Sequence, residues 1–230
     1  MSGKVSVFGD SILRGVQPDS GRRFYVNDNL GLGAIAHSHG LSVQNFSKLG
    51  CTITKAWHYV QKMFTRIDAD MVLMNFGGND CDFNWAQIDR DPLSDHRPNT
   101  ELDEFAGTYG RIVDHVKAQR RLPVLFTLVP GQKNKYIDYI CARDGLDREN
   151  VNLWMDRNGI DLDVLQASYS DAVRNVAASR EIPLLDIRSA FISQGREGDL
   201  LCDDGIHPNS KGQKVIRDCF ENFMGDYLSF

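Results

Sequence analysis

Short apolar runs of strand length alternate along this chain with longer segments of helical periodicity. Such an alternation predicts βαβ units, in which parallel strands form a sheet and the intervening helices cover both of its faces. Two of the runs, Met71–Phe76 and Val124–Val129, are almost continuously apolar, as the central strands of a parallel sheet are. We therefore expect an α/β fold, a three-layer αβα sandwich around a parallel sheet of about five strands.

The expected strands are Lys4–Phe8, Leu41–Phe46, Met71–Phe76, Pro123–Val129 and Ile182–Asp186. Helices are expected where apolar residues recur every three or four positions, at Asp28–His39, Thr54–Phe64, Thr100–Gln119, Asp163–Ala178 and Ser210–Tyr227. Thr100 and Asp103 are expected to cap the third of these helices.

Two polar stretches, Cys81–Asn99 and Gly131–Ile160, show neither pattern, and we expect irregular loops there. They follow the third and fourth strands, and ligands of open α/β sheets bind beyond the carboxyl ends of strands. Both stretches are therefore candidates for substrate contact, although surface insertions without a function have the same composition.

Composition limits the class of protein. A chain of 230 residues with 42% hydrophobic residues is long enough to form one domain, 1–230, with a sizeable core. The net charge of −5 and the lack of a basic run argue against a nucleic-acid partner. No apolar run is long enough to span a membrane and the first strand starts at once, so we expect a cytoplasmic protein.

The cysteines argue against a disulfide framework or a zinc site. There are five, an odd number, and none forms a Cys-x-x-Cys pair. Their pattern is typical of reduced thiols in a core.

Near the N-terminus, the strand Lys4–Phe8 runs directly into Gly9-Asp10-Ser11. The glycine permits a tight turn, and Ser11 would then begin a helix, whose N-terminus favours developing negative charge. A simple turn with a serine at the start of a helix gives the same tripeptide. Taken alone, this segment favours the simple turn.

Near the other end, Asp204 precedes His207 by three residues, with a glycine between them. A histidine acts as a general base only when it is held in one tautomer. Asp204 could reach Nδ1 and leave Nε2 facing a serine; the adjacent Asp203 is the alternative, but its spacing suits a tight loop less well. The other interpretation is a surface turn before the last helix.

Two further segments follow strands. Asn79 comes after Gly77-Gly78, where the backbone can approach a ligand and the side-chain amide can face a developing oxyanion. Gly50 follows the second strand, and its backbone N–H could be another oxyanion donor. An ordinary Gly-Asn turn and an ordinary loop glycine explain each segment separately.

Together, in this order, the four segments resemble the SGNH (GDSL-type) hydrolase family over essentially the whole chain. The resemblance implies the flavodoxin-like SGNH hydrolase fold. It also implies that Ser11 is the nucleophile, that His207 is the general base and then acid, and that Asp204 orients the histidine. The oxyanion hole would comprise the backbone N–H groups of Ser11 and Gly50 and the Asn79 side chain, without a metal or organic cofactor.

The function expected from this resemblance is that of a serine ester hydrolase acting on a small-molecule ester through an acyl-enzyme. Polar loops that carry tryptophan favour a small acyl group, such as acetyl, on a carbohydrate or similar polar substrate. Arg14, one helical turn beyond Ser11, and Trp85, in the loop after Asn79, are candidate substrate contacts. A solvated arginine and a tryptophan packed within its loop are the alternatives.

Several other functions stay open at this point. A lipase, lysophospholipase or thioesterase would use the same triad, and an acyltransferase would use it with an alcohol in place of water. Outside the enzymes, the alternative is a non-catalytic ligand-binding α/β domain. The first turn lacks the Gly-x-Gly-x-x-Gly sequence of a dinucleotide site, which argues against a nucleotide ligand.

Overall fold

The computed structural model describes residues 3–19, 23–27, 32, 41–195 and 197–228. The helix expected over Asp28–His39 lies outside this part of the chain, apart from position 32. All five expected strands are present and pair in parallel. They are β1 (Lys4–Gly9), β4 (Ser42–Asn45), β5 (Met71–Asn75), β6 (Leu122–Phe126) and β7 (Leu184–Leu185).

The sheet has the strand order β4-β1-β5-β6-β7. In chain order this is 2-1-3-4-5, the arrangement of flavodoxin-like folds. Strand β7 is shorter than expected because the Asp186 side chain accepts from Ser189 N and caps the next helix. The predicted α/β class and the five-stranded parallel sheet are confirmed.

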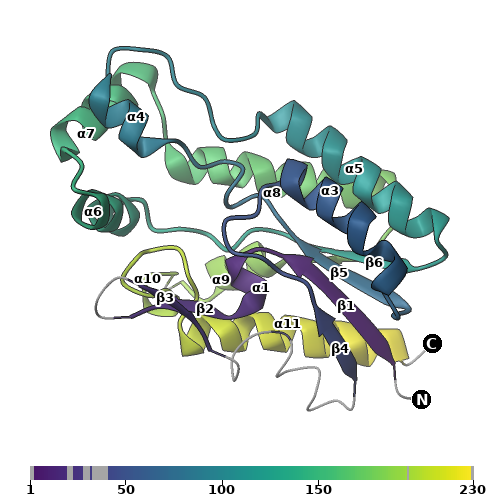
Figure 1. Cartoon of the computed structure of the whole chain (residues 1–230). Coiled ribbons are helices and arrows are strands. Elements are labelled where there is room, and N and C mark those ends of the chain that lie inside the picture. The colour runs from purple at the N-terminus through teal and green to yellow at the C-terminus, as the bar shows by residue number, and fades with distance from the viewer. Residues whose placement is uncertain (1–2, 20–22, 28–31, 33–40, 196, 229–230) are drawn as a thin grey trace.

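Alternate residues of the central strands face two separate cores. Val72 and Met74 lie in one core with helices α3, α5 and α8, whereas Met71 and Leu73 lie in the other with α9 and α11. Figure 1 shows α3, α5 and α8 on one side of the sheet and α11 on the other. Because a strand points successive side chains to opposite faces, a continuously apolar strand such as β5 serves both layers.

Four helices over the two faces begin and end near the expected positions. They are α3 (Ile53–Met63), α5 (Leu102–Ala118), α8 (Leu162–Ser179) and α11 (Ser210–Leu228). The structure adds α9 (Ile187–Ser193), which was not expected, and the short helices α1 (Ser11–Arg14), η1 (Phe64–Arg66) and α10 (Glu197–Leu200). The expected cap of α5 is wrong. Its N-cap residue is Glu101, without a side-chain capping bond, and Thr100 N instead donates to Asp80 O.

The expectation of irregular loops over Cys81–Asn99 and Gly131–Ile160 is wrong in large part. These stretches contain α4 (Trp85–Arg90), α6 (Lys133–Asp144) and α7 (Arg148–Asn158). The three helices, here called the helical cap, share a third core built largely of aromatic and aliphatic side chains. Figure 1 shows the helical cap beyond one end of the sheet, away from both termini.

The helices of the cap have recognisable ends. Gly145 and Gly159, both with φ near +60°, terminate α6 and α7, and the Asp147 side chain accepts from Glu149 N at the start of α7. These helix ends are the feature of the sequence from which α6 and α7 could have been predicted. The apolar periodicity is weaker, because most positions of α6 and α7 are polar.

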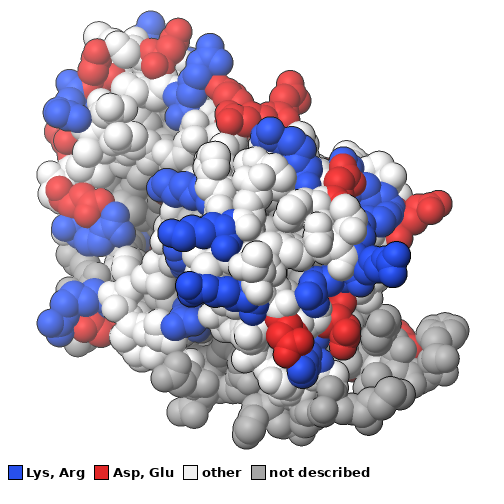
Figure 2. All heavy atoms as spheres, turned by 45° about the vertical axis from the view of Figure 1, so that its right-hand side comes forward, with Lys and Arg blue, Asp and Glu red and all other residues white. Residues whose placement is uncertain are grey.

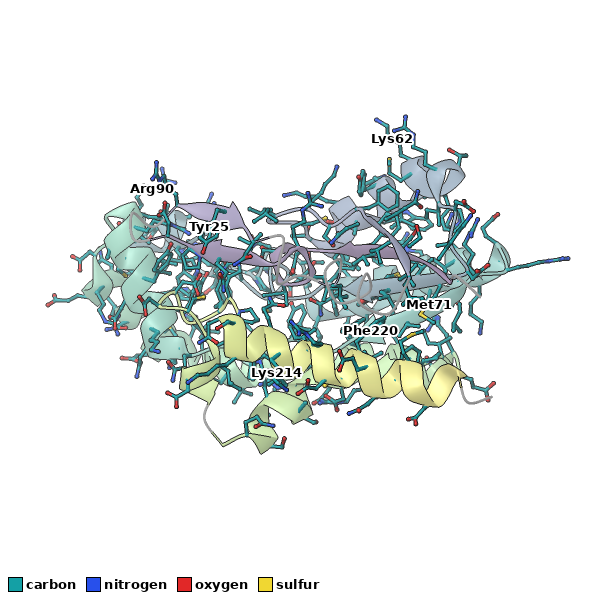
Figure 3. All side chains as sticks on the ribbon, turned by 90° about the horizontal axis from the view of Figure 1, so that it is seen from below. Tyr25, Lys62, Met71, Arg90, Lys214 and Phe220 are labelled. Atoms are coloured by element: carbon teal, nitrogen blue, oxygen red, sulfur yellow. The ribbon has the colours of Figure 1, made fainter. Side chains whose placement is uncertain are left out.

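A two-stranded antiparallel hairpin, β2 (Val16–Pro18) and β3 (Phe24–Val26), lies at the same end of the molecule as the helical cap. Figure 3 shows Tyr25 of this hairpin and Arg90 of α4 at one end, far from Met71, where β5 begins. The Gln17 side chain links the hairpin to the loop before α11 by donating to Pro208 O at 3.3 Å. The hairpin and the cap therefore flank the carboxyl ends of the strands.

Candidate active site

The candidate site lies at the carboxyl ends of β1, β4 and β5, where the order of the strands reverses direction. Strand β1 pairs with β4 on one side and with β5 on the other. Loops that leave these strands diverge and open a crevice, which is where open α/β sheets bind ligands.

Ser11 is placed by a tight turn at the end of β1. Asp10 is the N-cap residue of α1 and its Oδ1 accepts from Ile12 N at 2.9 Å. A Cβ at Gly9 would lie 3.1 Å from Asn75 O, so a glycine lets β1 and β5 run close together at this point. The result is a serine that begins a short helix directly beyond the sheet.

The loop 204–207 brings a carboxylate and an imidazole to this serine. Asp204 Oδ2 lies 2.6 Å from His207 Nδ1, and its Oδ1 accepts from the backbone N–H groups of Ile206 and His207. On the other side of the ring, His207 Nε2 lies 2.8 Å from Ser11 Oγ. Gly205 has φ +73°, and a Cβ there would lie 2.8 Å from Gln132 O, so this turn requires glycine.

Asp204 is charged and fully buried at this position. Burial alone would raise the pKa of its carboxyl, but the hydrogen bond and charge of His207, with the two backbone N–H groups, hold this pKa below its usual value. The neighbouring Asp203, the alternative in the sequence, is exposed and has no such contact with the imidazole. Asp204 is therefore the carboxylate that orients His207.

Gly50 and Asn79 lie in the loops after β4 and β5, and Asn79 borders the same cavity as Ser11. Gly50 is exposed with φ +65°, and its N–H donates to no residue in the described part of the chain. Asn79 Nδ2 donates to Asp10 Oδ2 at 3.0 Å and lies 3.5 Å from Cys51 O. The amide of Asn79 is thus oriented by the residue that precedes Ser11.

Two further carboxyls lie buried behind the serine. Burial raises the pKa of Asp10 to about 6, against the hydrogen bonds from Ile12 N and Asn79 and the charge of His207. Burial likewise raises the pKa of Asp80 to about 6, although its Oδ1 accepts from Ile53 N at 2.8 Å. These carboxyls hold the loops of the site together through their hydrogen bonds.

A cavity of about 110 Å³ opens beside Ser11 and runs toward the helical cap. Asn79 borders it near the serine, and Asp82, Tyr136 and Gln166 border it further away. Asp82 and Tyr136 come from the two stretches that were expected to be loops after the third and fourth strands. The cavity therefore joins the triad to the helical cap.

Neither candidate substrate contact lines this cavity. Arg14 Nη1 donates to Asn45 O at 3.3 Å, at the end of β4. Trp85 is only 6% exposed and packs in the core of the helical cap, where its Nε1 donates to Asp82 Oδ1 at 2.8 Å. Trp85 thus supports a residue of the cavity and offers no free ring face there.

Sequence reasoning missed Phe24 and Asp82. The ring of Phe24 lies 5.1 Å from that of His207, because the hairpin β2–β3 folds over the last loop. The strand that carries Phe24, β3, has only three residues and is too short to show a periodicity in the sequence. Asp82 follows Gly77-Gly78-Asn79-Asp80 by two positions and could have been found by its proximity to that segment.

Lys and Arg side chains gather on the face that Figure 2 shows, although the net charge of the chain is −5. Near the site, burial and the charges of Asp10 and Asp80 raise the pKa of Cys51, next to Gly50, to about 11, against the charges of Lys48 and Lys55.

Other kinds of site find no support in the described residues. No three His, Cys, Asp or Glu side chains in this part of the chain are grouped to hold a metal ion. None of its helices is long and apolar enough to cross a membrane. The five cysteines are free thiols, as their spacing predicted.

Comparisons with known proteins concern the family and the fold of the chain. The model of the GDSL-like lipase/acylhydrolase family matches residues 7–215. A lipase/acylhydrolase from Enterococcus faecalis is similar in structure, with a TM-score of 0.67, 16% sequence identity, and coverage of 95% of this chain and 93% of that one. No curated protein sequence matches the chain.

Two similar structures are of acetyl esterases. The acetyl xylan esterase AlAXEase has a TM-score of 0.65 and 18% identity, covering 95% of this chain and 98% of that one. A variant of Axe2, an acetyl-xylooligosaccharide esterase from Geobacillus, has a TM-score of 0.63 and 19% identity, covering 95% and 92%. At such identities these likenesses show the shared fold.

Proposed function

The chain belongs to the GDSL-like lipase/acylhydrolase family, and on that premise we propose that this carboxylic ester hydrolase removes small acyl groups, above all acetyl, from a carbohydrate or a similarly polar alcohol. The observation that carries the proposal is the continuous contact from Ser11 Oγ to His207 Nε2 and from His207 Nδ1 to Asp204 Oδ2, at 2.8 and 2.6 Å. A serine, a base and an orienting carboxylate in this order are what acyl transfer requires.

In the proposed mechanism, Ser11 Oγ attacks the ester carbonyl while His207 Nε2 takes its proton. His207 then gives that proton to the leaving alcohol, and an acyl-enzyme on Ser11 remains. A water molecule, deprotonated by the same nitrogen, attacks the acyl carbonyl, and His207 then returns this proton to Ser11 Oγ as the acid leaves. Asp204 keeps the proton of Nδ1 in place and stabilises the charged imidazolium in each half of the cycle.

The oxyanion of each tetrahedral intermediate would accept hydrogen bonds from Gly50 N–H, Ser11 N–H and Asn79 Nδ2. The Gly50 N–H has no other partner among the described residues. Asp10 holds one N–H of the Asn79 amide, and the other N–H of this nitrogen, which lies 3.5 Å from Cys51 O, would turn to the oxyanion. Preorganised donors of this kind each contribute on the order of 10²–10³ to the rate. The role of Asp10 is then to position Asn79.

The preference for a small acyl group on a polar alcohol is supported by the cavity beside Ser11. It measures about 110 Å³, and Asp82, Gln132, Lys133 and Gln166 are among the polar residues that line it. A long acyl chain placed there would remove water from these groups without replacing their hydrogen bonds. The two acetyl esterases of similar structure also support a small acyl group as the one that is removed.

The proposal is tested by measuring kcat/KM for p-nitrophenyl esters from acetate to laurate, together with a set of acetylated sugars. We expect the highest value for acetate and a steep decline with chain length. Ser11→Ala should remove the activity on every ester. A preference for long chains would contradict the acetyl esterase, and full activity of Ser11→Ala would contradict the mechanism itself.

A further inference from the structure

We infer that Asp82 determines specificity by accepting a hydrogen bond from a hydroxyl group of the substrate's alcohol portion. The inference rests on the proposed ester hydrolase and adds a selective contact to it. Asp82 and Ser11 line the same cavity. The alcohol portion of an ester bound at Ser11 would therefore share this cavity with the Asp82 carboxylate. Asp82 itself has no part in bond making or breaking.

The carboxylate of Asp82 is fixed in one orientation by two donors. Trp85 Nε1 donates to Oδ1 at 2.8 Å, and Tyr136 OH donates to Oδ2 at 2.7 Å. Trp85 Nε1 also lies 3.2 Å from Tyr136 OH, which closes a triangle of polar groups. Burial raises the pKa of Tyr136 well above its usual value, so its hydroxyl keeps the proton that it donates.

Two carboxylate oxygens together accept about four hydrogen bonds, so the donors from Trp85, Tyr136 and the Phe83 backbone leave capacity for a ligand. Asp82 is partly exposed, whereas Trp85 behind it is buried. The unused acceptor capacity of Asp82 therefore lies on the side of the cavity. An acceptor that is held in place before binding costs little ordering when a ligand reaches it.

The helical cap supplies the rigidity of this arrangement. Trp85 packs edge-on against Trp154 and Phe83, with ring centres 6.2 and 5.5 Å apart, in the core of the cap. Tyr136 belongs to α6, so α4 and α6 both hold the same carboxylate. The buried Trp85 thus has a use in the site through Asp82, although it does not touch the cavity.

A donor from another helix faces the same space. Gln166 lines the cavity, and its Oε1 accepts from Gly131 N at 3.0 Å and from Arg188 Nη1 at 2.9 Å. These two bonds fix the amide and leave its Nε2 as a donor. Lys133 lines the cavity as well.

This mixture of groups selects the kind of ligand. A hydroxyl group donates to Asp82 and accepts from Gln166 or Lys133, so it satisfies both sides. An ammonium group has no lone pair for these donors and is repelled by Lys133. An apolar group would leave Asp82 buried without a replacement for its water. A hydroxylated alcohol is therefore the ligand that the part of the cavity around Asp82, Gln166 and Lys133 fits, while apolar side chains such as Leu128, Val129 and Leu162 line the rest.

The test compares two esters of similar size, glycerol monoacetate and propyl acetate, which differ in the two hydroxyl groups. The wild-type protein should hydrolyse glycerol monoacetate with a kcat/KM at least about tenfold higher, because the site loses bonds with the analogue that lacks the hydroxyls. In Asp82→Asn this ratio should fall about tenfold, mostly through KM for the glycerol ester. Tyr136→Phe, which removes one donor to Asp82, should lower the ratio by a smaller factor in the same direction.

Asp89→Asn is the matched control. Asp89 also belongs to the helical cap, and its carboxylate accepts from Asp147 N and from Asn150 Nδ2, but it does not line the cavity. This variant should keep the wild-type ratio, which separates a general loosening of the cap from the loss of a substrate contact.

The outcomes are distinguishable. A wild-type protein that is active on both esters without preference, or an Asp82→Asn variant that loses activity equally on both, would overturn the role of Asp82 and leave the hydrolase intact. If Asp82→Asn does not fold, an unchanged ratio in Tyr136→Phe would overturn it. A protein inactive on every ester would instead overturn the proposed function and this inference with it.

Discussion

The triad and the helical cap border the same cavity, but different interactions hold them in place. The triad depends on short-range hydrogen bonds at the ends of strands, such as those from Ile206 and His207 N–H to Asp204. The cap depends on packing among aromatic residues, with Phe83 and Trp154 at its centre. We propose that the first region carries the reaction and that the second carries its selectivity.

The largest effect is expected at Asp204. Asp204→Asn should lower kcat by about 10⁴, because the amide can no longer hold the proton on His207 Nδ1 and the imidazole takes the wrong tautomer. The remaining oxygen can still accept from the two backbone N–H groups, so the loop should stay folded. Steady-state kinetics with p-nitrophenyl acetate, with circular dichroism to check the fold, gives the measurement.

Asp203→Asn serves as the control for that experiment, since Asp203 is adjacent and exposed. It should retain the wild-type kcat. If the two variants were equally active, the orienting carboxylate would have to be another residue, and the reaction would not depend on this loop in the way described.

The next effect concerns the cap alone. Trp154 is 1% exposed, and Trp154→Ala removes a core side chain, which costs about 3–5 kcal/mol. Amide hydrogen exchange in α4, α6 and α7 should accelerate on the order of 10²–10³-fold, while exchange in β1 and β5 changes far less.

Leu153→Ala, at the exposed neighbouring position, is the control and should leave exchange in the cap near the wild-type rate. An equal acceleration of β1 and β5 in Trp154→Ala would break the comparison. The cap and the sheet would then unfold as one cooperative unit and would have no separate stability.

A smaller effect is expected where the two regions touch. Phe24 lies with its ring 5.1 Å from that of His207 and 6.3 Å from that of Tyr139 in α6. Such ring contacts are worth about 0.5–1.5 kcal/mol, so Phe24→Ala should lower kcat/KM for p-nitrophenyl acetate about 2- to 10-fold. Tyr25→Phe, on the same strand, should have no such effect; equal losses in both variants would show that the hairpin acts only through its folding.

The smallest effect concerns stability against pH. Burial raises the pKa of the Asp10 carboxyl from its ordinary value of 3.8 to about 6 in the folded protein, so folding favours the protonated form of this group. Its contribution is fully present below about pH 4 and is lost as the pH rises to about 6. Asp10→Asn should therefore flatten the fall in unfolding free energy over this range by at most about 1.4 kcal/mol per pH unit.

Urea titrations at intervals between pH 4 and pH 6.5 measure this slope. Asp80 is affected by burial in the same direction, so some slope should remain in the variant. If the unfolding free energy changed with pH in the same way in the wild-type protein and in Asp10→Asn, ionisation of the buried Asp10 carboxyl would not destabilise the folded state, and this account would be wrong.

The two regions also differ in how far the sequence predicts them. Strand β5 is apolar on both faces and Asp204 precedes His207 at a fixed spacing, so local patterns predicted the sheet and suggested the triad. The side chains of α6 and α7 are mostly polar, because their apolar face packs only against a small separate core. A periodicity that weak does not reveal a helix, and only the residues at the ends of these helices, Gly145, Asp147 and Gly159, indicated the cap in the sequence.

The lack of a local pattern also explains why the two candidate substrate contacts, Arg14 and Trp85, do not line the cavity. Arg14 and Trp85 were chosen because they lie close in sequence to Ser11 and Asn79. Whether such a side chain faces the cavity depends on partners far along the chain, Asn45 for Arg14 and Tyr136 for Trp85. Long-range packing of this kind leaves no local pattern.

The central claim, that Ser11 is the nucleophile activated by His207 and Asp204, is tested most directly by covalent labelling. The protein is incubated with diethyl p-nitrophenyl phosphate, and the adduct is located by intact mass and peptide mapping. The account predicts one diethylphosphoryl group on Ser11, its absence in Ser11→Ala, and much slower labelling of Asp204→Asn. An adduct on another residue, or labelling of Ser11→Ala at the wild-type rate, would contradict it.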